Sequence, residues 1–260
     1  MAMPISAFNN LASQTPEHKR QHRFTVIVAD DERTVHRCLE LRYDIFANEL
    51  GATLNTNTRK VDMDRFDPHS HHIAVIDNHT NEIVATTRIL DNHGSQQTNG
   101  FYSETEFDLS NILKLDQRFC EVGRTCIHPE YRRGSALLML WQGISRFVVE
   151  NQIDFLFGCA SIPFSNGDKY LNNVMRHLRE KHFADESLRV TPRIPLRLME
   201  NNSKVDDVIL PTLLKAYLRQ GALICGDPYW DAAFGVADVF VLLDSNEISA
   251  RYNKHFIERI

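Results

Sequence analysis

The sequence predicts a mixed α/β fold, in which a central mixed sheet carries helices on both of its faces. Segments with strand-like and helix-like hydrophobic patterns follow one another in the order β-α-β-β-β-α-β-α-α-β-β. One strand–helix–strand unit near the middle has the spacing of a parallel crossover. The chain has 260 residues, 43% hydrophobic and 24% charged, a balance typical of a globular protein rather than a disordered or fibrous one.

The beginning of the chain predicts a tail, a strand and a helix. Residues 1–22 have neither apolar periodicity nor a signal-peptide core, so we expect a disordered tail before a single domain at residues 23–260, and no export. The β-rich run Phe24–Ala29 predicts the first strand. Apolar residues at helical spacing then predict a helix over residues 34–48, which Gly51 ends.

A long polar segment and a hairpin come next. Residues 52–70 are rich in Thr, Asn and Asp, which predicts a long loop, and loops of this length are often functional. Residues 72–77 and 82–90 are β-branched runs separated by four polar residues, so we expect two antiparallel strands. A second polar stretch covers residues 91–100.

The second half of the chain supplies the parallel unit. Phe119–Ile127 predicts a strand, residues 135–151 carry the strongest helical stripe of the chain, and residues 153–160 form an apolar run typical of a strand buried on both faces. Two more helices and two more strands are expected at residues 170–182, 210–219, 222–225 and 238–243.

Charge and motifs exclude several classes of function. Residues 131–197 carry ten basic and six acidic side chains, too small an excess for duplex nucleic acid but suited to a smaller acidic partner. The sequence has no phosphate-binding P-loop, dinucleotide-binding glycine motif, serine nucleophile elbow or HExxH zinc helix. Its apolar stretches are far shorter than the roughly 20 residues of a membrane-spanning helix, so we expect at most a transient contact with a membrane surface.

Cysteines and histidines predict neither disulfides nor a metal. The five cysteines are an odd set without a CxxC pair, which favours a reducing cytoplasm. His69, His71, His72 and His79 are explained by a polar surface loop, so we expect no metal and no bound cofactor.

Residues 120–136 carry the most informative pattern. Gly123 interrupts the predicted strand, as glycines at β-bulges do. One extra residue there would bring Glu121 and Arg124 to the same side of the strand, where a carboxylate and a guanidinium share a cleft. The alternative for this pair is a structural ion pair.

A basic turn then leads into the strong helix. Arg132, Arg133 and Gly134 precede Ser135 and Ala136, at which the apolar helix opens. Backbone amides at a helix N-terminus, flanked by cations and by small residues, form a favourable site for a phosphate.

This bulged strand, basic turn and helix resemble the acyl-donor site of the GNAT-type acyltransferase fold. Gly134-x-Ala136 fits its usual pattern, whereas Tyr131 stands where Gln or Arg is usual. Over about residues 24–256 the chain resembles, more closely, the L-ornithine N(alpha)-acyltransferases of bacterial ornithine lipid synthesis. The motifs that carry this likeness are Glu121-Val-Gly-Arg124-Thr-Cys-Ile-His-Pro-Glu-Tyr-Arg132, Leu140-Trp141, Phe157-Gly-Cys-Ala-Ser161, Arg189-Val-Thr-Pro-Arg193, Leu213-Leu-Lys-Ala-Tyr217 and Cys225-Gly-Asp-Pro-Tyr-Trp-Asp231.

The acyl-homoserine lactone synthases share this fold and part of its pattern. The shared positions are Arg42, Phe46, Asp64, Asp67, Arg88, Glu121 and Arg124. Their tryptophan after the corresponding glycine is missing, since Ala52 follows Gly51, and the segment beyond residue 187 is longer than theirs. Both differences favour the lipid enzyme.

The resemblance implies a reaction and roles for residues. The enzyme would transfer a 3-hydroxyacyl group from acyl carrier protein to the α-amino group of L-ornithine, giving lyso-ornithine lipid in a bacterial cytoplasm. Glu121 is the candidate base, with Arg124 as the second catalytic candidate. The implied acyl-donor site consists of Ile127, Arg132, Arg133, Gly134, Ser135 and Ala136. The implied acceptor site consists of Arg42, Arg88, Asp64 and Asp67. One of the arginines, Arg42, Arg88 or Arg124, would bind the carboxylate of ornithine, and Asp64 or Asp67 the distant ammonium, although the aspartates could equally cap turns of the loop.

Two other classes of function fit parts of the same pattern. An acyl-homoserine lactone synthase, or another N-acyl amino acid synthase, would use a different acceptor. A non-catalytic acyl-carrier-binding or haemolysin-like protein is the alternative from another class. Cys126 and Cys159 are expected to be packed strand residues rather than nucleophiles, and Phe155 and Phe157 to form core rather than an acyl channel.

Overall fold

The structure is a computed structural model that describes residues 22–54, 59–164, 167–196, 198 and 208–246. The tail expected over residues 1–22 therefore lies outside the described residues except for His22.

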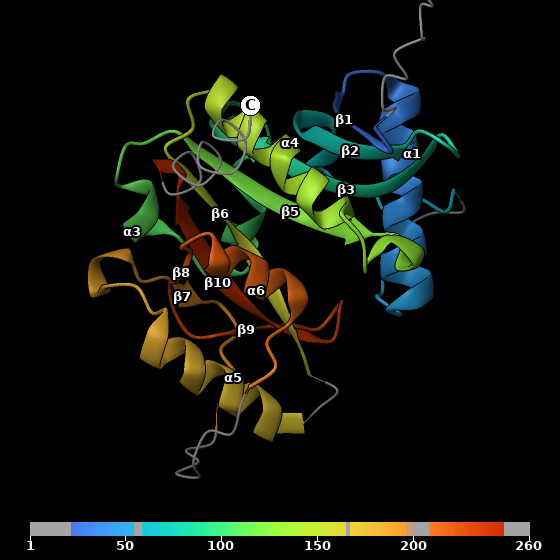
Figure 1. The fold of residues 1–260 in the computed structure, drawn as a ribbon. Coiled ribbons are helices and arrows are strands. Elements are labelled where there is room, and N and C mark those ends of the chain that lie inside the picture. Colours follow the sequence, from blue (N-terminus) through green and yellow to red (C-terminus); the bar gives the residue numbers. More distant parts are fainter. Residues whose placement is uncertain (1–21, 55–58, 165–166, 197, 199–207, 247–260) are drawn as a thin grey trace, which may run out of the picture.

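A mixed sheet of eight strands dominates the described part of the chain (Figure 1). Its strands are β1 (Phe24–Ala29), β2 (His71–Asp77), β3 (Glu82–Asp91), β5 (Phe119–Ile127), β6 (Phe155–Pro163), β8 (Leu223–Ile224), β9 (Tyr229–Asp231) and β10 (Val236–Asp244). They lie in the order β1-β2-β3-β5-β6-β10-β8, and β9 also pairs with β10. All pairs are antiparallel except β5 with β6. β4 (Phe107–Asp108) and β7 (Thr191–Pro192) form a separate two-stranded sheet.

Helices surround this sheet. The α-helices of the described residues are α1 (Glu32–Tyr43), α2 (Asn92–Gln97), α3 (Ser110–Leu113), α4 (Ala136–Glu150), α5 (Gly167–Lys181) and α6 (Thr212–Arg219). A π-helical segment (Asp44–Glu49) continues α1, and 3-10 turns occupy Asp67–His69, Tyr102–Thr105, Pro129–Tyr131 and Glu186–Leu188. Every strand and helix that the sequence predicts is present, and β5–α4–β6 is the predicted parallel crossover.

The two faces of the sheet are covered by different helices. Ile73 and Val75 of β2 pack into the core that α4 shares, whereas Ala74 between them packs into the core of α1. This alternation follows from the period of two along a strand. α4 approaches the sheet closely at Gly143, where a Cβ atom would lie 2.7 Å from side-chain atoms of Ile73 and Val26.

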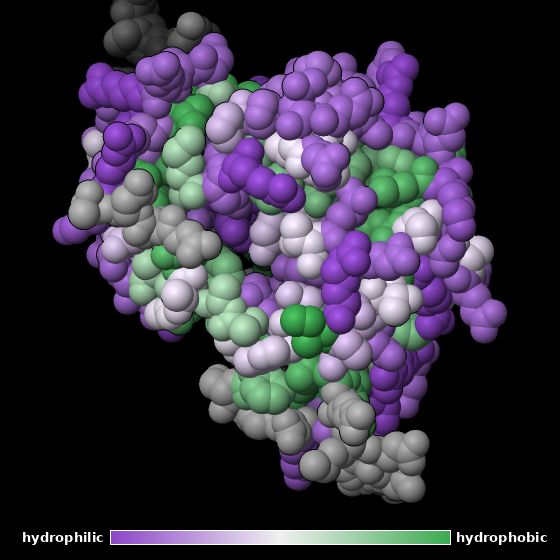
Figure 2. All heavy atoms as spheres, turned by 180° about the vertical axis from the view of Figure 1, so that it is seen from behind, coloured by the Kyte–Doolittle hydropathy of each residue, from purple (hydrophilic) through white to green (hydrophobic). Residues whose placement is uncertain are grey.

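None of the helices that the structure describes is both long enough and apolar enough to cross a membrane. Figure 2 shows the molecule from behind, and hydrophilic residues cover most of the described part of that face.

The parallel pair β5–β6 is short and opens into a fork. Its ladder joins residues 119–121 of β5 to residues 155–157 of β6 and then ends. β5 continues beside β3, and β6 continues beside β10, so the two strands separate beyond Glu121. At the base of the fork, Gly158 allows the backbone of β6 to lie close to that of β5, since a Cβ atom there would lie 2.3 Å from the carbonyl oxygen of Val122.

The bulge predicted in β5 is present, but one residue later than expected. The register between β3 and β5 shifts so that Arg124 and Thr125 lie opposite Thr87 alone. Arg124, not Gly123, has the left-handed backbone conformation, with φ of 51°. Gly123 pairs normally with Arg88, so the glycine is not what the bulge requires.

The two glycines of the fork should therefore respond differently to alanine. We expect Gly158→Ala to lower the free energy of unfolding by about 1–3 kcal/mol, because its methyl group would overlap the backbone of β5. Gly123→Ala is the matched control, since nothing lies within 4 Å of its Cβ position and its φ is not positive. Urea unfolding of both variants measures the difference, and equal losses would contradict the close approach at Gly158.

Candidate active site

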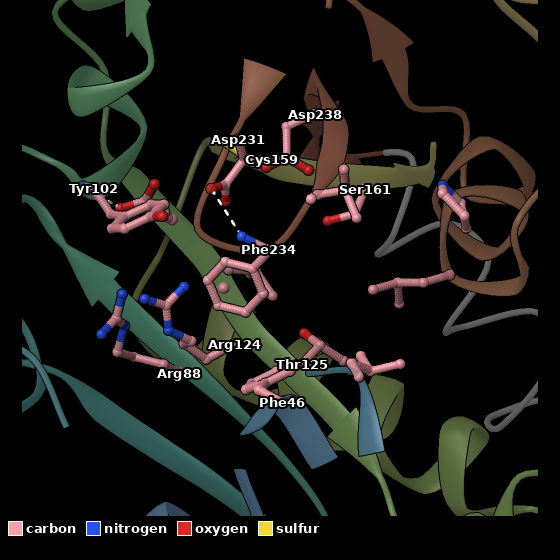
Figure 3. A pocket seen from close by; sticks show the side chains of 18 of the residues that line it. Phe46, Arg88, Tyr102, Arg124, Thr125, Cys159, Ser161, Asp231, Phe234 and Asp238 are labelled. Carbon is pink, nitrogen blue, oxygen red and sulfur yellow. Dashed lines mark hydrogen bonds between the residues drawn. The ribbon is translucent and has the colours of Figure 1, made fainter. Parts of the chain in front are cut away.

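A pocket of about 450 Å³ occupies the fork between β5 and β6 (Figure 3). Residues 121–125 of β5 form one wall, and Cys159, Ser161 and Pro163 of β6 form another. Arg88 and Arg124 lie at one end and Asp231 and Asp238 at the other, with the ring of Phe234 between them. The pocket thus presents guanidinium groups at one end and carboxyl groups at the other.

Glu121 is the last residue of β5 that pairs with β6, at the point where the fork begins. Its Oε1 accepts hydrogen bonds from the amide (2.6 Å) and hydroxyl of Ser103, and its Oε2 accepts one from the amide of Tyr102 (2.7 Å). The carboxyl group therefore caps the 3-10 turn Tyr102–Thr105. Burial raises the pKa of Glu121, although these hydrogen bonds and Arg88 oppose the shift.

The ion pair considered for Glu121 and Arg124 is not formed. Arg124 instead pairs with Asp62 (Nε–Oδ2 3.3 Å) and with Asp64 (Nη2–Oδ2 3.2 Å). Glu121 and Arg124 nevertheless both line the pocket, although the bulge is at Arg124 itself and not between the two residues.

The arginines and aspartates of the expected acceptor site bind one another. Arg42, which is fully buried, pairs with Asp67 at 2.6 Å and with Asp62 at 2.8 Å. Arg88 pairs with Asp64 at 2.6 Å and with Asp67 at 3.2 Å. Burial would raise the pKa of Asp67, but the charges of Arg42 and Arg88 hold it well below its usual range.

This network places only part of the expected acceptor set at the pocket. Arg88 and Arg124 line it, whereas Arg42, Asp64 and Asp67 do not. The two aspartates also bind the loop itself, since Asp67 accepts from the amide of Asp64 and Asp64 from that of Phe66. Sequence reasoning missed Asp62, for which the only signal was its position two residues before Asp64 in the same polar loop.

The sequence patterns also did not predict the carboxyl groups at the acidic end of the pocket. Carboxyl oxygens of Asp231 and Asp238, which line the pocket, and of Glu106, which does not, lie within 4.8 Å of one another, and all three residues are buried. Burial, together with the neighbouring carboxyl groups, raises the pKa of Glu106 to about 8 and that of Asp238 to about 7. A signal for Asp238 existed, because it is the polar residue inside the apolar run of β10.

The basic turn lies outside the lining of this pocket. Arg132 forms a two-pronged ion pair with Glu49 (2.6 Å for each bond) and also donates to the carbonyl of Ile127. Arg133 is exposed, and Gly134 donates its amide to Tyr131. Ser135 is the N-cap of α4 but makes no side-chain capping bond, so the first amides of α4, from Ala136 onward, have no side-chain cap.

The remaining candidates pack as side chains of the sheet. Cys126 is buried, and Cys159 lies beside the hydroxyl of Ser103 at 3.3 Å. Burial raises the pKa of both thiols, so neither is a thiolate near neutral pH. Phe157 is buried among aromatic rings, and Phe155 packs at the edge of the same core. His72, expected in a surface loop, is instead buried in β2 near Asp67.

The proteins that the chain resembles in sequence are acyltransferases. The family profile described as an acetyltransferase (GNAT) domain matches residues 41–142. The chain is 32% identical to an L-ornithine N(alpha)-acyltransferase of Brucella abortus over 89% of its length and 88% of that protein. It is 29% identical to one of Rhodobacter capsulatus over 91% of its length and 96% of that protein.

Solved structures share the fold at low sequence identity. A CoA-dependent acyl-homoserine lactone synthase, BjaI, superposes with a TM-score of 0.54 at 12% identity, covering 90% of this chain and 89% of that one. The acyl-homoserine lactone synthase LasI gives a TM-score of 0.51 at 14% identity, covering 86% and 90%.

The acidic cluster should make the free energy of unfolding fall as the pH rises toward 8. Because burial raises the pKa values of Glu106 and Asp238, the folded protein holds protons there that the unfolded chain has lost above its carboxyl pKa values near 4. Buried His72 has the opposite effect, but only below its unfolded pKa of 6.5. We expect the free energy of unfolding to decrease between pH 6.5 and 8, by at most about 1.4 kcal/mol per pH unit for each group.

The Glu106→Gln variant should flatten this dependence, because it removes one of the two titrating groups. The exposed Asp227, paired with Arg179 at the surface, supplies the control variant Asp227→Asn, which should keep the wild-type slope. Denaturant unfolding at several pH values measures both, and an unchanged slope in Glu106→Gln would show that the cluster does not titrate in this window.

Proposed function

Since the chain belongs to the family of L-ornithine N(alpha)-acyltransferases, we propose that it moves a 3-hydroxyacyl group from acyl carrier protein to the α-amino group of L-ornithine, giving lyso-ornithine lipid. Membership makes it an N-acyltransferase with bacterial relatives. The lactone-synthase alternative has only a shared fold in its favour, at 12–14% identity. Matches to enzymes along most of the chain argue against the non-catalytic alternative. A reducing cytoplasm fits the five cysteines, all of which are free.

One observation supports the proposal most directly: the fork holds a carboxylate, two guanidinium groups and an open strand edge in one pocket. Arg88 and Arg124 would receive the carboxylate of the amino-acid acceptor, since guanidinium groups bind carboxylates with paired hydrogen bonds. The α-amine then lies toward Glu121, at the base of the fork. Beyond Glu121 the facing edges of β5 and β6 have no ladder between them, so an extended thioester arm can hydrogen-bond along them.

The chemical step needs little beyond alignment and removal of a proton. The free α-amine attacks the thioester carbonyl carbon, the C–N bond forms, and the C–S bond breaks to release the thiol of the carrier. Glu121 accepts one proton from the α-ammonium before the attack, directly or through one water, and the second proton, which the nitrogen loses as the amide forms, protonates the departing thiolate. The Oε2 atom of Glu121 accepts one backbone hydrogen bond, from the amide of Tyr102, and keeps a lone pair for this purpose. A raised pKa suits such a base.

The donor end involves the turn before α4. The phosphate of the carrier's phosphopantetheine would meet amides at the start of α4, where no side chain caps the helix. Arg133, exposed and flanking that turn, would face the acidic carrier protein. Arg132 already forms an ion pair with Glu49, so its main role would be to hold the turn against the π-helical segment Asp44–Glu49.

The proposal predicts that purified protein acylates ornithine with 3-hydroxyacyl carrier protein and uses acyl-coenzyme A poorly. Mass spectrometry of the product, with each donor tested at low and moderate salt, measures this. Arg133→Glu should lower kcat/KM for the carrier protein far more than kcat, because a charge that acts in the encounter affects association.

A pantetheine thioester serves as the control donor for Arg133→Glu, since it lacks the acidic protein. Equal losses with the carrier and with the small thioester would remove Arg133 from the docking surface. Equal rates of the wild-type enzyme with carrier protein and coenzyme A would refute the donor assignment.

Glu121→Gln should lower turnover by about 10²–10⁴-fold, the loss expected for a positioned base. It should also lower the free energy of unfolding by about 1–3 kcal/mol, because an amide NH₂ would face the amide of Tyr102 or Ser103. The matched control is Ser103→Ala, which removes a hydrogen bond to Glu121 but leaves the carboxyl group, and should retain most turnover.

The pH profile separates the two roles of Glu121. A base gives kcat/KM an acidic limb that Glu121→Gln lacks. If Glu121→Gln keeps turnover within about threefold of wild type, or if Ser103→Ala loses as much, Glu121 is a scaffold residue only.

A further inference from the structure

The ammonium group at the end of the acceptor's side chain needs a partner that the aspartates of the polar loop do not provide. Asp62, Asp64 and Asp67 are each paired with arginines, and none of them lines the pocket. A cation entering the pocket beside Arg88 and Arg124 would also meet like charges. The anionic partner must therefore lie elsewhere along the pocket.

The acidic cluster at the far end has the required properties. Glu106 and Asp238 are 2% and 4% exposed, and Glu106 Oε2 and Asp238 Oδ1 have no hydrogen-bond partner. Within the described ranges, no arginine, lysine or histidine forms an ion pair with these residues or with Asp231. Unpaired buried carboxyl groups are costly, so their convergence indicates a site that a cation completes.

On the basis of the proposed function, we propose that Asp231 and Asp238, which line the pocket, bind the side-chain ammonium of the acceptor, with Glu106 as the third carboxyl group of their cluster, and so select a short basic amino acid. Asp231 and Asp238 line the pocket opposite Arg88 and Arg124, so a ligand that spans it carries a carboxylate at one end and a cation at the other (Figure 3). The α-amine then lies between these ends, toward the fork.

The cluster matches an ammonium group in its number of hydrogen-bond acceptors as well as in its charge. An alkylammonium has three N–H donors, and one carboxyl oxygen from each of the three residues lies within 4.8 Å of the others. Asp231 is oriented for this by its own loop, since its Oδ1 accepts from the amides of Ala233 (2.9 Å) and Phe234 (3.2 Å). Asp238 is fixed by the ladder between β10 and β6, in which it faces Ser161.

A divalent cation is the rival occupant, because carboxyl oxygens also bind Mg²⁺ and Ca²⁺. Those ions take six or more oxygen ligands, whereas the backbone amides of Ala233 and Phe234 already occupy Oδ1 of Asp231. The position of the cluster in the acceptor pocket favours the organic cation, and the experiment below distinguishes the two.

The test compares ornithine with norvaline, which has the same carbon chain but no terminal ammonium. We expect wild-type kcat/KM to favour ornithine by roughly 10³-fold or more, as in sites built to bind a polar group that the competitor lacks. Asp238→Asn should reduce the ratio of kcat/KM for ornithine to kcat/KM for norvaline at least tenfold, mainly through a higher KM for ornithine. Glu106→Gln is the second variant, and Asp227→Asn, which removes a surface carboxylate, is the control that should keep the wild-type ratio.

Each outcome has a distinct meaning. If wild-type protein acylates neither acceptor, the proposed function fails and not only this inference. If ornithine is acylated but both pocket variants keep the wild-type ratio, the inference is overturned. The same holds if the variants lose both acceptors equally while their Tm is unchanged, since the cluster would then serve the chemistry. If EDTA abolishes the preference for ornithine over norvaline and Mg²⁺ or Ca²⁺ restores it, the cluster is a metal site and the ammonium assignment is overturned.

Discussion

The early end of the ladder between β5 and β6 is the constraint on which the site depends. Strands in a continuous sheet lie about 4.8 Å apart, too close for a ligand to pass between them. Here the pairing stops at Glu121 and Phe157, and each strand then follows its other neighbour, β3 or β10. Because those outer ladders are long, the fork remains open without loosening either half of the sheet. The pocket is thus a property of the strand pairing rather than of a flexible loop.

A buried network of three arginines and three aspartates supports one side of this fork. Arg42 on α1, Arg88 on β3 and Arg124 on β5 all reach the loop that carries Asp62, Asp64 and Asp67. The charges balance, and removing one partner from such a network leaves an uncompensated buried charge, which is strongly destabilising. The network therefore orders a loop that has no hydrophobic periodicity, and it fixes the two guanidinium groups that face the pocket.

Hydrophobic periodicity was sufficient for the long elements of the fold but not for the short ones. β5 was predicted with its correct ends, and the antiparallel hairpin and the parallel crossover followed from spacing. α2, α3, β4, β7 and β9 were not predicted, because two to six residues cannot display a period. The bulge was assigned to Gly123 on composition, whereas the backbone places its left-handed residue at Arg124.

The site was harder to predict than the fold, since its residues meet only through tertiary pairing. Glu121 and Arg124 share one strand and could be linked by counting residues. Asp231 and Asp238 lie on the paired strands β9 and β10, whereas Glu106 follows the 3-10 turn Tyr102–Thr105 and meets them only through the tertiary fold. The motif ending at Asp231 was noticed for its resemblance, and nothing local distinguished its carboxyl group from a turn residue.

The central position of β10 has a consequence for how the protein is made. β10 pairs with β6 along its whole length, from Val236 opposite Pro163 to Asp244 opposite Phe155, yet it follows α5 and α6 in the chain. During synthesis, β6 emerges from the ribosome well before its partner and exposes an apolar edge that other nascent chains can pair with. Expression of this protein should therefore depend on chaperones during that interval, and a stall in translation between β6 and β10 would leave an aggregation-prone half-sheet.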